Sequence, residues 1–352
     1  MKNAKKLTAG QKAAAITGIV LGAIVVFLAV VLLSVHLVTP LVFPDFFGNA
    51  RTEYVTPGIY AGLVPQGYTY VAEEDVYLQC GYMADGESPS RIYVTNASDT
   101  TDSRYVELYA ADGTPYTGHT GGITAGYGFV WLANDGDGED NCVWVLSLND
   151  VLTAEDGGKI TLTTRFKSET RAACCFVDDD YLWVGEFNDG EKYVTDASHR
   201  FTVSGGDNYA LVCAYPLDAK SVYGVAFTEA DGIETFTPAL CLSVTDLVQG
   251  FTRTPEGFAL STSYGLNMSH IYFYSDVTAG DPNASIRLND TDVPVYFLDA
   301  DSLTADLSTP PMSEEIFVKD GRLYVLYESA CQKYIFGNLT RGIHTYSYGL
   351  AS

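Results

Sequence analysis

Several histidine and acidic residues stand where they could bind or transform a ligand. His119 precedes Gly121 and Gly122, so an imidazole that can titrate near neutral pH lies beside backbone that a ligand can approach closely. Glu186 and Glu328 follow strand-like segments at matching positions, and two carboxyl groups about 5 to 9.5 Å apart can hydrolyse a glycosidic bond. A capped turn at His119 and solvated carboxylates in loops are the alternatives.

The full set of candidates comes from loops that the predicted fold gathers mainly on one face. The catalytic candidates are His119, Arg171, Glu186, His199, His270 and Glu328, and the binding candidates are Tyr82, Asn134, Asp135, Tyr264 and Asn267, with Gln249 in the same loops. No P-loop, dinucleotide-binding glycine motif, HExxH motif or GxSxG motif occurs in the sequence. Nucleotide-driven chemistry and the familiar serine hydrolases therefore lose most of their support.

One acidic turn is similar to the start of a calcium loop. Asp135, Asp137 and Glu139 alternate along a glycine-containing turn, and carboxylate oxygens suit a hard cation. The pattern departs from the EF-hand, because Asp140 stands where glycine is required and Leu146 where glutamate is required. An exposed acidic loop is the favoured interpretation, so we expect no cofactor and leave calcium as the weak alternative.

Five repeated hairpins must position these residues. Each has a small or polar first residue, a short strand, a tight acidic or glycine-containing turn and a second strand. They are GYTYVAEEDVYLQ from Gly67, GITAGYGFVWLA from Gly122, ACCFVDDDYLWVG from Ala173, GFTRTPEGFALST from Gly250 and EIFVKDGRLYVLY from Glu315. Internal repetition of strand hairpins is typical of a radial array, so we expect an all-β fold, a β-propeller.

Further strand-like segments follow each hairpin and predict four-stranded blades. Third strands are expected at 90–96, 142–148, 209–215, 269–275 and 333–338, and fourth strands at 105–109, 160–166, 221–227 and 293–299. We expect five blades within residues 51–352. Six blades are the alternative, because the 77-residue interval between Ala173 and Gly250 could hide a degenerate blade near IETFTPALCLSV.

The two ends of the propeller are expected to meet in one blade. A ring lacks an open sheet edge only when its ends pair, so 51–57 and 343–349 are predicted to join. In such a ring, the loops into the innermost strands and the loops between second and third strands emerge on one face around the axis. Ligands prefer concave sites with convergent polar groups, so this face is the expected binding face.

The hairpin repeats carry a resemblance at the level of architecture. Over roughly residues 51–352 the chain resembles membrane-anchored and secreted bacterial β-propellers. The repeats match neither the WD40 nor the kelch signature, and no catalytic motif of a named enzyme family is matched. The resemblance therefore implies a fold and a location, but no reaction.

A single apolar segment precedes the repeats. Residues 13–34 carry no charge, and 22 helical residues rise about 33 Å against a hydrocarbon core of about 30 Å. A cleaved signal peptide is the alternative, but its apolar region should be shorter and end at a small-residue site. We expect a cytoplasmic tail at 1–12, a single-pass membrane anchor at 13–38, a short stalk at 39–50 and an extracellular propeller at 51–352. The lysines before the anchor, Lys2, Lys5, Lys6 and Lys12, predict this orientation.

The expected outer part is strongly acidic. The four lysines of the tail are among 20 basic residues, so 16 basic residues face 44 acidic ones beyond it, a net charge of −28. Such a surface repels nucleic acid. The seven cysteines all lie in this part, mostly within strand patterns, so we expect mainly buried thiols and leave one disulfide bridge open.

Two functions of different classes remain open. The first is a surface module that binds a glycan, peptide or protein on its tyrosine-rich face, because tyrosine offers a large contact area and a polar group. The alternative is a hydrolase or lyase that acts on carbohydrate or phosphoester at the channel mouth. A purely structural role is the third and least favoured.

Overall fold

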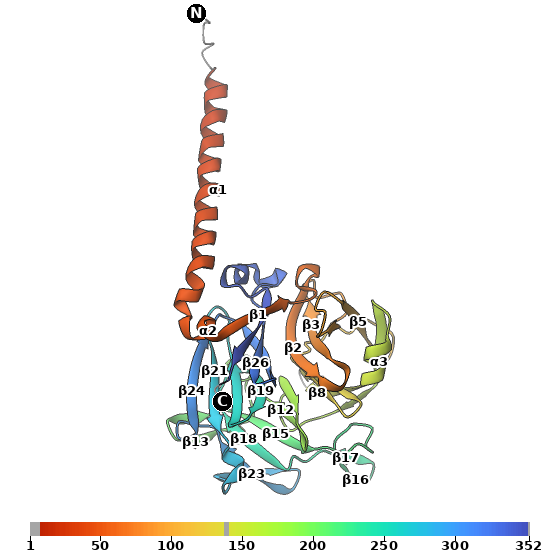
Figure 1. Cartoon of the computed structure of the whole chain (residues 1–352). Coiled ribbons are helices and arrows are strands. Elements are labelled where there is room, and N and C mark those ends of the chain that lie inside the picture. The colour runs from red at the N-terminus through yellow and green to blue at the C-terminus, as the bar shows by residue number, and fades with distance from the viewer. Residues whose placement is uncertain (1–7, 137–140, 351–352) are drawn as a thin grey trace, which may run out of the picture.

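The computed structural model describes residues 8–136 and 141–350, without the side chains of residues 335, 336, 338 and 339. Five mainly antiparallel sheets stand around a common axis, and a long N-terminal helix projects from them (Figure 1). The innermost strands of neighbouring sheets contact one another in a closed cycle. The predicted five-bladed propeller behind one apolar helix is confirmed.

The first two blades follow the chain closely. Blade 1 contains β2 (Leu63–Val71), β3 (Val76–Met83), β4 (Arg91–Asn96) and β5 (Ser103–Ala110), and β9 (Gly158–Leu162) adds a parallel strand at its edge. Blade 2 contains β6 (Gly122–Gly126), β7 (Phe129–Asp135), β8 (Asn141–Ser147) and β10 (Thr164–Phe166). Short helices η2 (Ala72–Glu74) and α3 (Leu148–Thr153) lie in their connections.

Blade 3 is enlarged and explains the long interval in the sequence. Its strands are β11 (Cys174–Val177), β12 (Tyr181–Gly185), β15 (Ala210–Pro216) and β18 (Leu240–Val244), extended by β23 (Thr291–Phe297) and β22 (Ala284–Leu288). Two small hairpins accompany it, β13 (Phe201–Val203) with β14 (Gly206–Asn208) and β16 (Thr228–Ala230) with β17 (Ile233–Thr235), and η4 (Ala197–His199) precedes the first. The segment suspected of hiding a sixth blade therefore forms β17 and β18.

Blades 4 and 5 complete the ring. Blade 4 contains β19 (Val248–Thr254), β20 (Gly257–Thr262), β21 (Ser269–Ser275) and β24 (Leu303–Thr309), with η5 (Val277–Ala279) after β21. Blade 5 contains β25 (Ser313–Lys319), β26 (Arg322–Tyr327), β27 (His344–Gly349) and, as its outer strand, β1 (Ala50–Val55). Since β1 pairs with β27, the predicted closure by the two ends of the domain is confirmed.

Four strand expectations were wrong. Residues 160–166, expected as one strand of blade 2, are divided between β9 in blade 1 and β10 in blade 2. Residues 333–338 lie in η6 (Gln332–Thr340), because successive turns hydrogen-bond this segment to itself and Gly337 packs directly on the backbone of Ser329. Residues 221–227 form turns, and β18 is the fourth strand of blade 3. Residues 293–299 overlap β23, which joins blade 3 rather than blade 4.

The hairpin turns show why the repeats fold locally. Asp320 and Gly321, between β25 and β26, both have positive φ angles, 51° and 69°. Two consecutive residues in this conformation form the turn whose twist matches that of paired strands, and Asp-Gly is a preferred sequence for it. The local sequence thus sets the hairpin before any contact between blades forms.

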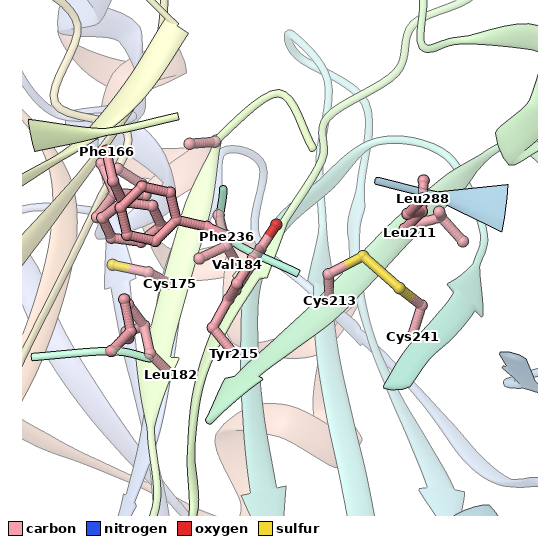
Figure 2. Close-up of a cluster of buried hydrophobic side chains, with 14 of the residues drawn as sticks. Phe166, Cys175, Leu182, Val184, Leu211, Cys213, Tyr215, Phe236, Cys241 and Leu288 are labelled. Atoms are coloured by element: carbon pink, nitrogen blue, oxygen red, sulfur yellow. A yellow bond between two sulfur atoms is a disulfide. The ribbon is translucent and has the colours of Figure 1, made fainter. Parts of the chain in front are cut away.

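Apolar side chains pack the blades against one another. Between blades 2 and 3, Phe166 and Phe236 stack with ring centroids 4.8 Å apart beside Tyr215 (Figure 2). Cys213 and Cys241 are register partners on β15 and β18 and form a disulfide, whereas the other five cysteines are free and buried. Each fully buried apolar side chain contributes about 1.5–3 kcal/mol, so such interfaces hold the ring together.

The segment between the apolar helix and the first blade is folded onto the propeller. Helix α1 (Ala9–Val42) is long and apolar enough to cross a membrane. Helix α2 (Pro44–Asn49) follows it, and Phe46 is fully buried among Tyr327, Tyr346 and Tyr348. Residues 39–50, expected to form a stalk, therefore include the end of α1, all of α2 and the start of β1.

Candidate functional site

A pocket of about 550 Å³ opens on the axis of the propeller. Its walls come from the loops that lead into innermost strands and from the ends of second strands, and we call this side of the ring the mouth face. The lining residues used below are Gln66, Tyr82, His119, Asp135, Phe187, Lys192, Tyr193, Gln249, Tyr264, Glu328, Lys333 and Tyr334. Ligand pockets commonly measure about 300–1,000 Å³, so this one is large enough for a small ligand.

The pocket contains half of the residues selected from the sequence. Tyr82, His119, Asp135, Tyr264 and Glu328 all line it, and so does Gln249. They come from blades 1, 2, 4 and 5 and meet because each lies at the same end of its blade. The repeat pattern thus correctly predicted that these residues lie close together, while their roles stay predictions.

A buried glutamate closes the axis below the pocket. Glu315 on β25 accepts hydrogen bonds from the backbone N–H groups of Tyr68 at 2.7 Å, Ile123 at 2.8 Å and Cys175 at 3.2 Å. These donors belong to the innermost strands of blades 1, 2 and 3, so one carboxyl group joins four of the five blades. Burial raises the pKa of Glu315 well above its usual value, although these three hydrogen bonds act to lower it.

Small residues make room for this carboxyl group. A Cβ atom on Gly122 would lie 2.7 Å from Oε1 of Glu315, and one on Gly250 would lie 2.8 Å from its Cα atom. Real Cβ atoms do not approach other atoms this closely, so both positions require glycine. Four of the five repeats begin with a small residue, and the fifth begins with Glu315, which fills the space that the glycines leave.

Glu328 is the buried acid of the pocket itself. Nε2 of Gln66 donates a hydrogen bond of 2.8 Å to its Oε2 atom. Burial raises the pKa of Glu328 to about 7, although His119, Gln66 and Lys333 act to lower it. Burial, with Glu328 and Glu315 as negative neighbours, also raises the pKa of Glu314 well above its usual value. Glu328 therefore keeps its proton to a higher pH than an exposed glutamate does.

The same pocket also carries a carboxyl group whose pKa is lowered. Oδ1 of Asp135 lies 3.3 Å from Nδ1 of His119. Burial alone would raise the pKa of Asp135, but the contact with His119 and the charge of Arg171 bring it below its usual value. The pocket thus holds two carboxyl groups whose environments shift their pKa values in opposite directions.

Aromatic rings form much of the remaining surface. Tyr82 packs against His119 with ring centroids 5.3 Å apart and accepts a hydrogen bond of 2.7 Å from Lys333. Phe187 contacts Tyr193 and Tyr264, with centroids 5.7 and 6.2 Å apart. Rings held against one another in this way offer flat apolar faces at little entropic cost.

Glu186 and His199 occupy a different place from Glu328. Glu186 is buried, accepts hydrogen bonds from the backbone N–H groups of Arg171 and Leu211, and lies 2.9 Å from Nδ1 of His199. Glu186, His199 and Arg171 line a separate cavity of about 860 Å³. The expected pair of Glu186 and Glu328 across the channel therefore does not share one pocket, because Glu186 supports the loop that follows β12.

The remaining candidates lie outside the axial pocket. His270 pairs with Asp306 at 2.7 Å where β21 meets β24, and it stacks on Tyr272. Asn134 is buried within β7, whereas Asn267 is exposed in the loop between β20 and β21. His270 thus takes part in a contact between neighbouring strands.

The suspected calcium loop lies partly beyond the described residues. Asp137 and Glu139 fall in 137–140, and Asp135 contacts His119. Within 8–136 and 141–350, no three His, Cys, Asp or Glu side chains are grouped so that they could hold a metal ion.

Sequence reasoning missed Gln66, Glu314 and Glu315. A signal was present, since SEEIF places two adjacent acids at the start of an innermost strand, where the other repeats carry small residues. A charged side chain that replaces glycine at a repeated position near the axis cannot be a solvated surface residue.

Comparison with known proteins finds only distant similarity to solved structures. No family model and no curated protein sequence matches the chain. An exo-β-1,3-galactanase structure from Phanerochaete chrysosporium has a TM-score of 0.44 at 12% identity over 85% of this chain and 63% of its own. Regucalcin from Agrobacterium tumefaciens has a TM-score of 0.40 at 9% identity, over 86% of this chain and 93% of its own. BamB from Moraxella catarrhalis has a TM-score of 0.33 at 9% identity, over 80% of this chain and 84% of its own. The chain thus spans less than two thirds of the galactanase, and the class that its own fold and site define is a five-bladed β-propeller with a closed axis.

The central glutamate should dominate stability. Glu315→Ala removes the acceptor of three buried N–H groups, each worth about 1–3 kcal/mol, so we expect a loss of several kcal/mol in the free energy of unfolding. Glu315→Gln keeps one carbonyl oxygen and should lose less. Both losses of stability can be measured by denaturant titration of the full chain in detergent, with the fluorescence of the buried Trp131 and Trp183 as the readout. Glu256→Ala, in an exposed hairpin turn, is the matched control, and equal curves for both alanine variants would refute this role.

Glu328 should make stability depend on pH. Its pKa is about 7 in the folded protein and 4.5 in an ordinary exposed glutamate, so between these values the folded state holds a proton that the unfolded state has lost. Its contribution to stability is therefore full below pH 4.5 and is lost as the pH rises towards 7. Glu328→Gln, which mimics the neutral acid, should show a smaller loss of stability across this range than the original chain. Parallel unfolding curves at pH 4.5, 6 and 7.5 test this difference, and identical pH dependence would contradict it.

Proposed function

We propose that this protein is a membrane-anchored propeller that binds a saccharide in its axial pocket outside the cell. The main support is the pocket itself, which Glu315 closes below and which combines aromatic faces with convergent amide, carboxyl and hydroxyl groups. Sugars present apolar C–H faces, which can stack on the aromatic rings, and many hydroxyl groups, which can hydrogen-bond to the polar side chains. A peptide or protein ligand at the same face is the alternative within this class.

Packing at the end of α1 supports retention of the apolar helix. Thr39 is buried against the rest of the chain, and Nε of Arg341 donates a hydrogen bond of 3.3 Å to the His36 carbonyl oxygen. A cleaved signal peptide would have no need for such contacts with the mature domain. The lysines of residues 1–12 favour a cytoplasmic tail, and the acidic propeller would then face the exterior.

Saccharide binding should depend on the exposed ring at the rim. Tyr264→Ala removes a stacking surface without opening the core, since this side chain is about half exposed, and should weaken binding about tenfold. Isothermal titration of the full chain in detergent, with oligosaccharides chosen from a glycan array, measures the change. Tyr127→Ala, similarly exposed in the hairpin turn at the opposite end of blade 2, should bind as the original chain does. Equal weakening by both variants, or no saccharide bound by the original chain, would overturn the proposal.

A hydrolase is the second candidate because one observation favours it. Glu328 has a raised pKa and Asp135 a lowered one within the same pocket, which is the division of roles that a general acid and an ionised carboxylate need. Among the sequence candidates for catalysis, His119 and Glu328 line this pocket, whereas Glu186 and His199 are bound to each other elsewhere.

Turnover should then require both carboxyl groups. Glu328→Gln and Asp135→Asn should each lower the rate of oligosaccharide cleavage by about 100-fold or more, since general acid–base catalysis contributes about 10²–10⁴-fold. This rate can be measured with the full chain by detecting the released sugars with chromatography. Asp112→Asn, in an exposed turn, serves as the control. If the original chain binds oligosaccharides but does not cleave them, the hydrolase proposal is refuted and the binding proposal stands.

A further inference from the structure

The mouth face carries exposed apolar side chains in one sector. Leu266 is 73% exposed and Tyr60 69%, and Tyr264 and Met268 are also exposed. They come from η1 (Ile59–Ala61) before blade 1 and from the loop between β20 and β21 of blade 4. Ile59 of η1 is buried in an apolar cluster with Val64, Ala330 and Cys331, but none of the four exposed side chains belongs to a cluster that packs the blades.

This sector lies on the side from which α1 projects. In Figure 1 the chain between β26 and β27, which is η6, stands beside the lower part of α1 on the upper side of the propeller. Arg341 bonds to the His36 carbonyl oxygen, and Gln332 donates a hydrogen bond of 3.2 Å to the carbonyl oxygen of Tyr60. Tyr264 and Lys333 line the same axial pocket, so the loop of blade 4 faces the same side.

The charge of this sector is opposite to that of the rest of the domain. Segments 56–62, 263–268 and 329–343 contain no acidic residue, and their charged residues are Lys333 and Arg341. The part of the chain beyond residue 12 has a net charge of −28, so this absence of acids is local. Acidic side chains are instead concentrated in other loops, such as 178–180 and 189–191.

We propose that this anchor-side patch, formed by Tyr60, Leu266, Met268, Lys333 and Arg341, lies on the surface of the bilayer that α1 crosses. The inference rests on the proposed anchoring by α1. Tyrosine and basic side chains are favoured at the membrane–water interface, where leucine and methionine can enter the acyl boundary. The two cations can also pair with the phosphate groups of lipid headgroups, for which the acidic surface of the rest of this domain is unsuited.

The bilayer is the occupant that the structure favours over another protein. Residues 13–38 place the membrane next to His36, and the contact of Arg341 with that residue holds η6 at the same level along α1. With α2 packed into blade 5 through Phe46, the propeller cannot swing away on a flexible stalk. The patch would therefore meet lipid without any further partner.

Lipid contact can be measured with a fluorescent probe at one position of the patch. The full chain carrying Leu266→Cys is labelled with bimane and reconstituted into vesicles of phosphatidylcholine and phosphatidylglycerol that contain a nitroxide-labelled lipid. Ile233→Cys is the matched control, because this residue is 68% exposed and lies in β17, far from α1 in Figure 1. Labelling of the unsubstituted chain checks that its buried cysteines stay unreacted.

We expect the probe at residue 266 to lose about half of its fluorescence, because an interfacial side chain lies within reach of lipid-borne quenchers. The probe at residue 233 should stay bright. Equal brightness at both positions, or equal quenching, would overturn the inference. Vesicles contain no other protein, so quenching identifies lipid as the partner, and flotation of the vesicles shows separately whether α1 anchors the chain. Saccharide titration in detergent is unaffected by this result, so failure of the patch and failure of the binding function are distinguishable.

Discussion

The structure depends on a single carboxyl group at the axis of the ring. Glu315 receives backbone hydrogen bonds from three neighbouring blades and extends from the fifth, so the innermost strands can approach the axis only with this side chain between them. The glycines around it, such as Gly122 and Gly250, exist because the carboxyl group and the β25 backbone need their space. A ring of five blades has a narrow centre, and here one residue fills it.

The pocket follows from this closure. Because the axis is blocked at Glu315, the mouth of the channel becomes a concave site rather than a pore, and the ends of five second strands supply its walls. The same burial that surrounds Glu315 extends to Glu314 and Glu328, and it raises the pKa of Glu328 to about 7. Structural support and candidate chemistry therefore share one blade, and changes to blade 5 should affect both.

Local sequence was sufficient where neighbouring residues decide the structure. Hairpins such as the one around Asp320 and Gly321 could be predicted, and so could the closure of the ring, since an unpaired edge strand is unfavourable. The error at 333–338 has a physical reason, because KYIFGN has strand-forming residues but Gly337 packs onto Ser329 and favours turns. Strand β23 was assigned to the wrong blade, since only packing decides which sheet edge it extends.

The sequence by itself determined the repeat, the apolar helix, the charge and the set of polar residues at equivalent ends of the blades. Periodicity and turn chemistry are local properties, so they can be recognised without a fold. Only the tertiary structure decided which of those residues meet: it placed Glu328 with His119 and Asp135, and it bound Glu186 to His199 in a different cavity. It also decided that the adjacent acids Glu314 and Glu315 are buried, because distances across a ring depend on how blades pack and not on spacing along the chain.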